Sequence, residues 1–391
     1  MKVVYMDNNA TTMVSDEVRE VMQPYFSELY GNPSSMHTFG GQVHREIEDA
    51  RAEVAALINA EPEEIIFTSC GTESDNTALM SGLLSNPGKK HLITTRVEHP
   101  AVLNFSKTMA RRGYRVTFLP VDKLGRLDLD ELKESITDDT AIVSIMYANN
   151  ENGVIFPIEE ITEIVRSKGT IFHTDAVQAA AKLALDVKEL PVDMLSLSGH
   201  KMHAPKGVAA LYVRKGTRFS PYMIGGHQER GRRSGTENVA SVIGFGKASE
   251  LAMEHLSSDN GKLAGLRDRL EKGLLNTCPG ARVNGDISNR LPNTTNISFE
   301  YVEGEAILLR INEYNICASS GSACTSGSLE PSHVLRAMGV PFTCIHGSVR
   351  FSLSRYTTDE DVDIVLEKMP GIIKELRELS PFGREVKEED L

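Results

Sequence analysis

The repeated alternation of short apolar runs with longer amphipathic stretches is the feature that most constrains the fold. One stretch places Val43, Ile47, Ala50 and Val54 on a single face, because residues three and four apart are neighbours on a helix. Between such stretches the sequence predicts strands at Glu64–Ser69, His91–Thr95, Arg115–Pro120, Ala141–Tyr147, Thr170–Thr174, Met194–Ser198 and Ala209–Val213. Strands that alternate with helices form βαβ units, so we predict an α/β fold with a mostly parallel, seven-stranded sheet between layers of helices.

A polar turn cluster at Ser257–Gly261 interrupts this alternation. Beyond it the sequence predicts a charged helix at Leu263–Leu275, strands at Asn296–Tyr301 and Val349–Leu353, and a closing helix at Thr358–Leu379. A chain of 391 residues has room for two or three domains. We therefore predict a large domain of residues 15–258 and a smaller α+β domain formed by residues 1–14 and 259–391.

Charge and cysteine content exclude several classes of function. The chain has 42 Lys and Arg residues against 54 Asp and Glu, a formal net charge of -12, so we expect no binding to nucleic acid or to an anionic membrane surface. No apolar run approaches the roughly 18 residues that a membrane span needs, and Asp7 comes before any signal-type apolar stretch can form. Five cysteines without a C-x-x-C pair argue against a disulfide framework and a structural zinc site, so we expect a reducing, cytoplasmic location.

The strongest chemical signal is the segment Ser196–Lys201, which follows the start of a predicted buried strand and contains two serines and a histidine. A lysine is more often a solvated surface charge than a catalyst, but ligands of α/β proteins collect at the carboxyl ends of the strands. The two serine hydroxyls, of Ser196 and Ser198, and the imidazole of His200 are groups that could hold a phosphate beside Lys201. An amine next to phosphate ligands is what an aldehyde cofactor such as pyridoxal phosphate requires.

Asp175 lies at the end of the preceding predicted strand, in the segment His173–Gln178. Alone, it would most simply be the N-cap of a helix, and a metal ligand is an alternative. A carboxylate at this position also suits the ring nitrogen of pyridoxal phosphate, which must stay protonated if the ring is to accept electrons. Because Lys201 follows one strand later, the cofactor role is favoured.

Two segments of small residues complete the pattern. Gly71 and Thr72 follow the first predicted strand, where a helix N-terminus would offer its N–H groups to a phosphate and glycine would allow a close approach. Cys324 lies in Ala318–Ser328, a Ser/Gly-rich segment with almost no large apolar residue, which favours an exposed and mobile nucleophilic thiol. The other cysteines are expected to be small buried hydrophobic residues, namely Cys70, Cys278, Cys317 and Cys344.

Seven motifs occur in the order that one enzyme family shows. They are Asp7–Thr12, Gly31–His37, Glu98–Val102, Ala148–Glu151, Ser198–Lys201, Arg233–Asn238 and Ser320–Cys324. Over nearly its whole length the chain resembles the pyridoxal-phosphate-dependent cysteine desulfurases, and it is most similar to the nitrogenase-associated NifS type through His203–Gly207 and Leu329–His333. The resemblance implies the fold of aspartate aminotransferase (fold type I) and a homodimer with active sites at the subunit interface.

The resemblance also implies a role for each site residue. Lys201 would form the Schiff base with the cofactor, Asp175 would bind the ring nitrogen, and His99 would stack on the ring. Further cofactor contacts would come from Gly71, Thr72, Asn150, Gln178, Ser198, Gly199, His200 and, across the dimer, Thr236. Arg350 would bind the substrate carboxylate with its planar fork, with help from Asn32.

The implied reaction converts L-cysteine to L-alanine. Lys201 would remove the Cα proton, His99 would move protons near the substrate, and the thiolate of Cys324 would take the sulfur as a persulfide. An iron–sulfur scaffold protein would accept the sulfur, for clusters related to nitrogenase. No resident metal is implied, although Cys324 could contact an iron–sulfur cluster, and selenocysteine cleavage is a close variant that the sequence leaves open.

Three other interpretations compete with this one. An aminotransferase or lyase could use the same fold, since fold does not determine chemistry, but it would need no nucleophilic cysteine. A binding module for nucleic acid or phosphate could use Arg230, Arg232 and Arg233, against which stand the acidic net charge and the interleaved glutamates. A metal site at His200 and His203 is disfavoured, because the phosphate role explains His200 better.

Overall fold

The largest element of the protein is a seven-stranded sheet in the order β2-β8-β7-β6-β5-β3-β4. The structure is a computed structural model that describes residues 2–320 and 331–380. The strands are β2 (Ile65–Thr68), β3 (His91–Thr95), β4 (Arg115–Leu119), β5 (Thr140–Ser144), β6 (Ile171–Asp175), β7 (Met194–Ser198) and β8 (Ala209–Val213). Neighbouring strands are parallel except where β8 pairs antiparallel with β2 and β7. The predicted α/β fold with a mostly parallel sheet is confirmed, and each strand overlaps the apolar run that predicted it.

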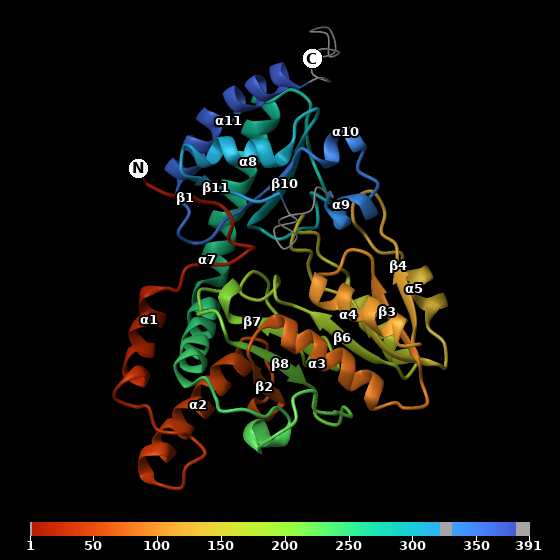
Figure 1. The fold of residues 1–391 in the computed structure, drawn as a ribbon, viewed down its shortest axis with the longest axis vertical. Helices are drawn as coiled ribbons and strands as arrows, with labels where there is room; N and C mark the ends of the chain where they lie inside the picture. Colours follow the sequence, from red (N-terminus) through yellow and green to blue (C-terminus); the bar gives the residue numbers. More distant parts are fainter. Residues whose placement is uncertain (1, 321–330, 381–391) are drawn as a thin grey trace.

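Helices cover both faces of this sheet (Figure 1). Successive strand residues point to opposite faces, so Ile65 and Phe67 of β2 join one apolar core and Ile66 joins the other. The face with Ile66 packs against α3 (Gly71–Leu84) and α4 (Pro100–Arg111). The opposite face packs against α1 (Asp16–Met22), α2 (Thr38–Ala56), α5 (Leu129–Ser135), α6 (Ile158–Ser167) and the first half of α7 (Val239–Thr277). Short 3₁₀ turns lie at Gln23–Phe26, Pro62–Glu64, Gly199–Lys201 and Gln228–Gly231.

A second group of elements surrounds a three-stranded antiparallel sheet in the order β12-β10-β9 and a parallel pair of β1 with β11. These strands are β1 (Val4–Tyr5), β9 (Ala281–Val283), β10 (Thr294–Phe299), β11 (Ile316–Cys317) and β12 (Ser348–Ser352). Helices α8 (Gly304–Asn312), α11 (Asp359–Leu379) and the second half of α7 pack on them around a separate core. We call this group the small-sheet region, and the seven-stranded sheet with its covering helices the large-sheet region.

Helix α7 corrects the turn predicted at Ser257–Gly261, because it is one continuous helix of 39 residues through this cluster. Ser, Asp, Asn and Gly each cost roughly 0.5–1 kcal/mol relative to Ala inside a helix, which is why the sequence suggested a break. Burial on both sides offsets that cost. The first half of α7 buries Phe245 in the large-sheet core, and the second half buries Leu266 and Leu270 in the small-sheet core, at about 1.5–3 kcal/mol for each large side chain.

The structure has two separate cores with α7 running through both, and the division into two domains stays a prediction. Helices α9 (His333–Ala337) and α10 (Phe342–Ile345) differ from the proposed boundaries. Their buried side chains, such as Leu335 and Ile345, join the large-sheet core, although residues 259–391 were assigned to the small domain. Within the part of the chain that the structure describes, no helix is long and apolar enough to cross a membrane.

Candidate active site

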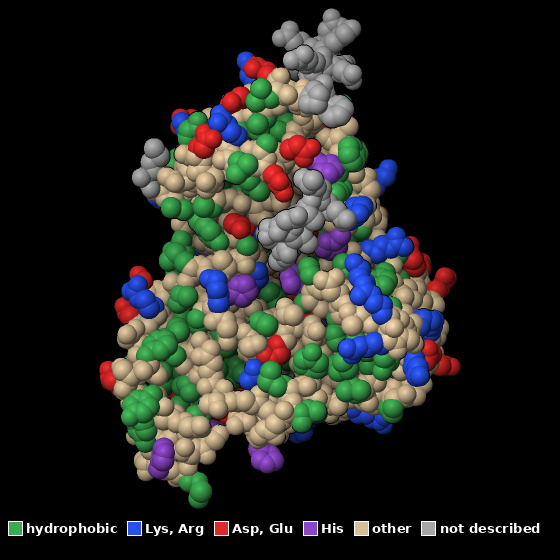
Figure 2. Space-filling model, in the orientation of Figure 1, with side chains coloured by type: hydrophobic (Ala, Val, Ile, Leu, Met, Phe, Trp, Pro, Cys, Tyr) green, Lys and Arg blue, Asp and Glu red, His purple; other side chains and the backbone are tan. Residues whose placement is uncertain are grey.

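A cavity of about 310 Å³ lies at the carboxyl ends of β6 and β7, where the large-sheet and small-sheet regions meet. Figure 2 shows histidine side chains gathered near this boundary. Because the carboxyl ends of parallel strands lie along one edge of a sheet, ligands commonly bind there. The cavity is lined by Asn9, Ala10, Cys70, Gly71, Thr72, Asp75, His99, Met146, Ala148, Asn150, Asp175, Val177, Gln178, Ser198, His200, Lys201 and Arg350.

Lys201 enters the cavity from the 3₁₀ turn that follows β7. Its Nζ donates hydrogen bonds to the backbone oxygens of Asn9 at 2.6 Å and Ala10 at 2.7 Å. Both acceptors belong to the N-terminal segment, which crosses from β1 toward the large sheet and is held there by a Thr12 N–H bond to His200 O at 2.9 Å. The amine is therefore oriented at the edge of the cavity by backbone carbonyls.

Asp175 ends β6 and lies beside Ser196 of β7 in the sheet register. Its Oδ1 accepts a hydrogen bond from Val177 N at 2.9 Å. Burial raises the pKa of Asp175 to about 6, while the Val177 N–H and the Lys201 cation act in the opposite direction. A cationic partner in the cavity would lower this pKa further, so the site favours a positively charged ring N–H near the carboxylate.

The N-terminus of α3 forms a second side of the cavity, with Gly71 and Thr72 in its first turn. A Cβ on Gly71 would lie 3.1 Å from Val177 Cγ2 and 3.5 Å from Ser198 Cβ, so glycine allows the helix to approach the sheet edge closely. Within the described part of the chain, the buried hydroxyl of Ser198 has no hydrogen-bond partner. Free N–H groups and an unpaired hydroxyl together suit a phosphate.

His99 caps α4, and its Nδ1 accepts a hydrogen bond from Ala101 N at 3.2 Å. This bond places the proton of the neutral ring on Nε2. Burial, and then the charges of Lys201 and His333, lower the pKa of His99 to about 4. Burial and Lys201 also lower the pKa of His200 to about 4. Both imidazoles are therefore neutral near pH 7 and present a planar ring or a proton acceptor to the cavity.

Arg350 reaches the cavity from β12 of the small-sheet region. Its Nη2 lies 2.6 Å from Asp7 Oδ1, and its Nη1 donates to Asn150 O at 2.9 Å. The Nε atom is buried and has no partner among the described residues. The guanidinium is thus held in one orientation with capacity for another acceptor, which suits an anionic group of a small ligand.

Most of the residues predicted for the site meet at this cavity. Its lining includes His99, Lys201, Gly71, Thr72, Asn150, Asp175, Gln178, Ser198, His200 and Arg350. Three others do not line it: Gly199 is buried within the turn Gly199–Lys201, and Asn32 and Thr236 are exposed elsewhere on the chain. Cys324 lies outside the described residues.

The described segments on either side of residues 321–330 are attached close to the cavity. On one side, the Ser319 and Arg350 backbones exchange hydrogen bonds of 3.2 and 2.6 Å. On the other side, Ser332 Oγ donates to Glu151 Oε2 at 2.5 Å, and His333 Nε2 lies 2.9 Å from Glu98 O.

Sequence reasoning missed several lining residues: Asn9, Ala10, Cys70, Asp75, Met146, Ala148 and Val177. Cys70 and Cys317 are half-buried, and only Cys278 and Cys344 of the four described cysteines are fully buried as predicted. The motif Asp7–Thr12 was the one feature of the sequence from which the two N-terminal lining residues, Asn9 and Ala10, could have been predicted. Its carbonyls bind Lys201 only because β1 pairs with β11, a long-range contact that no local pattern indicates.

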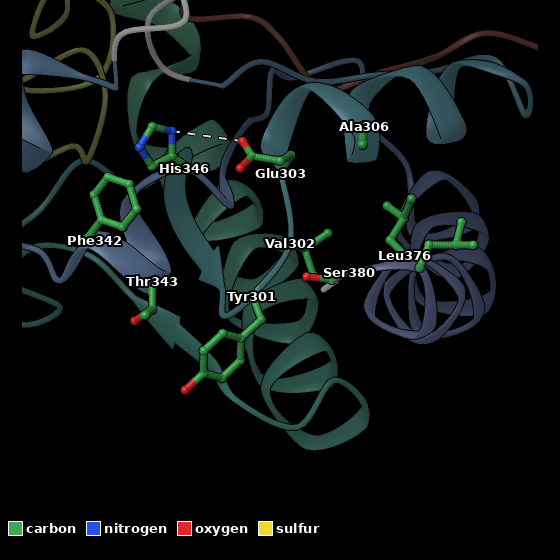
Figure 3. A pocket seen from close by; sticks show the side chains of 10 residues that line it. Tyr301, Val302, Glu303, Ala306, Phe342, Thr343, His346, Leu376 and Ser380 are labelled. Atoms are coloured by element: carbon green, nitrogen blue, oxygen red, sulfur yellow. Dashed lines mark ion pairs between the residues drawn. The ribbon is translucent and has the colours of Figure 1, made fainter. Parts of the chain in front are cut away.

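Neither a cavity away from the sheet edge nor a metal site offers comparable chemistry. The second cavity, of about 380 Å³, lies between α8, α10 and α11 in the small-sheet region, and Figure 3 shows Phe342, Val302 and Leu376 on its walls. It has no lysine, and most of its lining is apolar. Among residues 2–320 and 331–380, no three metal-ligating side chains cluster, and His203 Nδ1 lies 2.9 Å from Met13 O.

Comparison with known proteins gives a consistent result. Residues 4–365 match the aminotransferase class-V family. The chain is 61% identical over 382 residues to a cysteine desulfurase of Nostoc sp., covering 98% of this chain and 96% of that protein. It is 57% identical over 383 residues to the cysteine desulfurase NifS of Azotobacter vinelandii, covering 98% and 95%.

Solved structures agree. A NifS-like protein superposes with a TM-score of 0.91 at 41% identity, over 96% of this chain and 100% of that one. The structure described as SspA in complex with cysteine superposes with a TM-score of 0.80 at 34% identity, over 90% and 99%.

Proposed function

Since the chain belongs to the aminotransferase class-V family and, within it, to the cysteine desulfurases, we propose that the cavity at the sheet edge binds pyridoxal 5'-phosphate and L-cysteine. The observation that carries this proposal is the convergence of an amine and a carboxylate from adjacent strand ends, Lys201 and Asp175, on one cavity. Arg350 faces them from the small-sheet region. The family is pyridoxal-phosphate-dependent, and the unpaired hydroxyl of Ser198 beside the α3 N-terminus fits the phosphate of that cofactor.

Each group of the cofactor has a counterpart in the lining. Lys201 would hold the aldehyde carbon, and Asp175 would pair with the ring nitrogen. The imidazole of His99 would lie against the ring, as its neutral state allows. Thr72 and Ser198 would bind the phosphate, together with Gly71, His200 and, from a second subunit, Thr236. Asn150 and Gln178 would contact the remaining polar edge, and the Gln178 Oε1 is buried without a partner among the described residues.

The bound cofactor supplies an electron sink that makes the Cα proton of an amino acid acidic. Asp175 keeps the ring nitrogen protonated, because a buried carboxylate beside a cation stabilises that charge. Lys201 would accept the Cα proton of the substrate at its Nζ. His99, neutral with its proton on Nε2, moves a proton near the substrate as general acid or base.

Arg350 would bind the substrate carboxylate. A guanidinium forms two parallel hydrogen bonds with a planar carboxylate, which fixes the orientation of the Cα–H bond. Asp7 and the carbonyl of Asn150 hold the side chain in place from behind. Asn32 is proposed to assist from another part of the site, although it does not line this cavity within one chain.

Cys324 would receive the sulfur. Its thiolate attacks the substrate sulfur, an S–S bond forms as the Cβ–S bond breaks, and the electron pair stays on the carbon skeleton that becomes alanine. Ser319 and Ser332, on either side of residues 321–330, are bonded to Arg350 and Glu151, respectively. An acceptor protein then removes the terminal sulfur.

The biological setting is proposed from the relatives. The similarity to NifS supports a role in iron–sulfur cluster assembly linked to nitrogenase, with a scaffold protein as sulfur acceptor. We propose that the protein is a cytoplasmic homodimer, with Thr236 of one subunit completing the site of the other.

Cys324→Ser tests the proposed function. Serine keeps a small polar side chain but is a poor nucleophile toward sulfur, so the variant should bind cofactor and respond spectrally to L-cysteine while releasing no alanine or sulfide. Wild-type protein given L-cysteine without reductant should carry one extra sulfur atom on the peptide with Cys324, by mass spectrometry. Cys70→Ser is the matched control, because Cys70 also lines the cavity. Desulfuration by Cys324→Ser at the wild-type rate would instead favour a lyase.

A further inference from the structure

Asn9 is a buried asparagine whose side chain the proposed function does not use. It is 1% exposed and lies in the N-terminal segment that follows β1. Its Nδ2 donates hydrogen bonds to Thr294 Oγ1 at 2.8 Å and to Asn150 O at 3.1 Å, and its Oδ1 accepts one from Asn293 Nδ2 at 3.1 Å. Because a backbone carbonyl only accepts hydrogen bonds, the contact with Asn150 O identifies the nitrogen end of the amide. Both polar atoms of the side chain are thus bonded, and the amide is held in one orientation.

The backbone of Asn9 joins the two regions of the molecule. Its carbonyl oxygen accepts hydrogen bonds from Lys201 Nζ at 2.6 Å and Gln178 Nε2 at 3.0 Å, which both belong to the large-sheet region. Its N–H donates to Ser352 Oγ of β12 at 2.9 Å, and its side chain bonds Thr294 of β10, so these contacts come from the small-sheet region. One acceptor of the Lys201 amine is therefore held in place by residues of the small-sheet region.

An amine held by fixed carbonyls is prepared to react with an aldehyde. The second acceptor of Lys201 Nζ is Ala10 O at 2.7 Å, so the end of this flexible side chain is held at two points. In the reaction the nitrogen lone pair bonds the aldehyde carbon and the nitrogen becomes positive. Two protons then pass from the nitrogen to the aldehyde oxygen, which leaves as water, and a C=N bond remains. Carbonyl oxygens that already contact the N–H groups stabilise the positive charge without having to reorient.

We propose that Asn9 is a positioning residue whose side-chain amide holds the Asn9 carbonyl, and through it the Lys201 amine, in the orientation that bonds an aldehyde. The inference rests on the proposed function, because Lys201 is taken as the amine that bonds the cofactor. It adds that the small-sheet region, through Thr294 and Asn293, sets the position of a reacting group of the large-sheet region.

A purely structural role is the competing explanation, since a fully bonded buried amide stabilises a fold wherever its carbonyl points. Asn8 offers a matched control. It is 4% exposed, and its Nδ2 donates to Ser352 O at 2.9 Å and to Tyr5 O at 3.3 Å. Neither acceptor belongs to the described residues that line the active-site cavity. Asn8→Ala therefore removes a comparable buried amide from the same segment without a direct contact to Lys201.

The experiment follows bond formation in the full-length protein freed of cofactor. The protein is mixed rapidly with pyridoxal 5'-phosphate at a series of concentrations, and the absorbance of the C=N bond is recorded. The limiting first-order rate constant reports the reaction of the amine, and the half-saturation concentration reports binding of the phosphate and ring. Asn9→Ala removes the amide, Thr294→Val removes its hydroxyl partner at constant shape, and Thr294→Ser keeps that hydroxyl.

The limiting rate constant should fall about 10- to 100-fold in Asn9→Ala, because a reacting group misplaced by about 1 Å costs up to about a hundredfold. The half-saturation concentration should stay at the wild-type value. Thr294→Val should lower the rate constant by less, since two bonds to the Asn9 amide remain, and Thr294→Ser should match wild type. Asn8→Ala should lower the urea midpoint of unfolding and leave the rate constant unchanged.

An unchanged or higher rate constant in Asn9→Ala would overturn the proposal. An equal fall in Asn8→Ala, or a change in the half-saturation concentration alone, would also overturn it in favour of the structural role. If Asn9→Ala does not fold, the difference between Thr294→Val and Thr294→Ser decides.

Borohydride reduction of loaded wild-type protein, followed by peptide mapping, distinguishes the two levels of the argument. Absence of a reduced bond at Lys201 in wild type would contradict the proposed function, and this inference with it. A reduced bond at Lys201, together with wild-type rate constants in Asn9→Ala and Thr294→Val, would contradict this inference alone.

Discussion

The large-sheet and small-sheet regions contribute to the cavity in different ways. In the large-sheet region, Lys201 and Asp175 follow strands whose register is fixed by a buried parallel sheet. In the small-sheet region, Arg350 reaches the cavity through contacts with Asp7 and Asn150, far from it in sequence. The large-sheet side thus has the groups proposed to hold the cofactor, and the small-sheet side those proposed to handle the substrate. Substitutions on the large-sheet side should therefore affect the cofactor, whereas substitutions on the small-sheet side, apart from those that act through Asn9, should affect the reaction of the substrate.

The largest effect is expected on the large-sheet side, from Lys201→Ala. This change removes both the covalent attachment of the cofactor and the base that accepts the Cα proton, so alanine formation should fall by at least about a thousandfold. The absorption spectrum of the protein with added cofactor should change as well. Alanine release and spectra are measured together. Lys206→Ala, which changes a nearby exposed lysine, is the control, and appreciable alanine production by Lys201→Ala would contradict the assignment.

A smaller effect is expected on the small-sheet side, from Arg350→Ala. Removal of one partner of a charged, desolvated contact costs roughly 2–4 kcal/mol, so kcat/KM for L-cysteine should fall about 30- to 1,000-fold. The spectrum of the resting enzyme should stay unchanged, unlike that of Lys201→Ala. Arg350→Lys should recover part of the loss, because it keeps the charge but not the planar fork. A change in the resting spectrum would show that the two sides are not separable in this way.

The difference between the two regions also explains which strands and helices the sequence predicts and which it does not. All seven strands of the large sheet were found because a strand buried on both faces is a continuous apolar run, as in Met194–Ser198. Short elements of the small-sheet region, such as β1 and β11, were missed because two-residue strands exist only through their pairing. The helix through Ser257–Gly261 was missed because its stability comes from burial at both ends and not from local propensity.

The residues of the candidate site also differ in whether local sequence patterns predict them. Lys201 and Asp175 were accessible to local reasoning, since each is a polar residue at the end of an apolar strand. Arg350 was assigned only through a resemblance, because a single arginine in a strand otherwise indicates a solvated surface. Asp75 was missed, since its place at the cavity depends on which turn of α3 faces β6.

The pH dependence of stability tests the buried part of the large-sheet side. Glu98 is fully buried, and burial raises its pKa to about 8, although the Thr95 hydroxyl and Met146 N–H oppose the shift. The folded form therefore keeps a proton that the unfolded chain loses above about pH 4.5, and stability from this group declines as the pH rises toward 8.

Glu98→Gln removes this titration and keeps the side-chain shape. The free energy of unfolding of wild type should fall relative to the variant by up to about 1.4 kcal/mol per pH unit between pH 5 and 8, measured by urea unfolding. Glu160→Gln, in the exposed part of α6, is the surface control. Equal pH slopes for wild type and Glu98→Gln would mean that Glu98 is ionised in the folded protein.

The smallest effect concerns the link between the two regions. Gly261 lies in the middle of α7, is exposed, and has open space where a Cβ would stand. Gly261→Ala should therefore raise the free energy of unfolding by about 0.5–1 kcal/mol. Gly265→Ala, four residues later and equally open, should do the same. Gly273→Ala should raise it by less, because a Cβ there would overlap the Leu366 side chain, which would have to move.

Measurement of kcat in these glycine variants tests whether α7 bends during the reaction and so moves the two regions relative to each other. If α7 connects the two regions rigidly, the cavity residues of the large-sheet side and those of the small-sheet side keep fixed relative positions during the reaction. Gly261→Ala should then raise the free energy of unfolding and leave kcat unchanged. A lower kcat in Gly261→Ala, with normal cofactor binding and no such loss in Gly265→Ala, would show that the helix bends at Ser257–Gly261. The glycine would then be retained for motion between the regions, despite its cost to the helix.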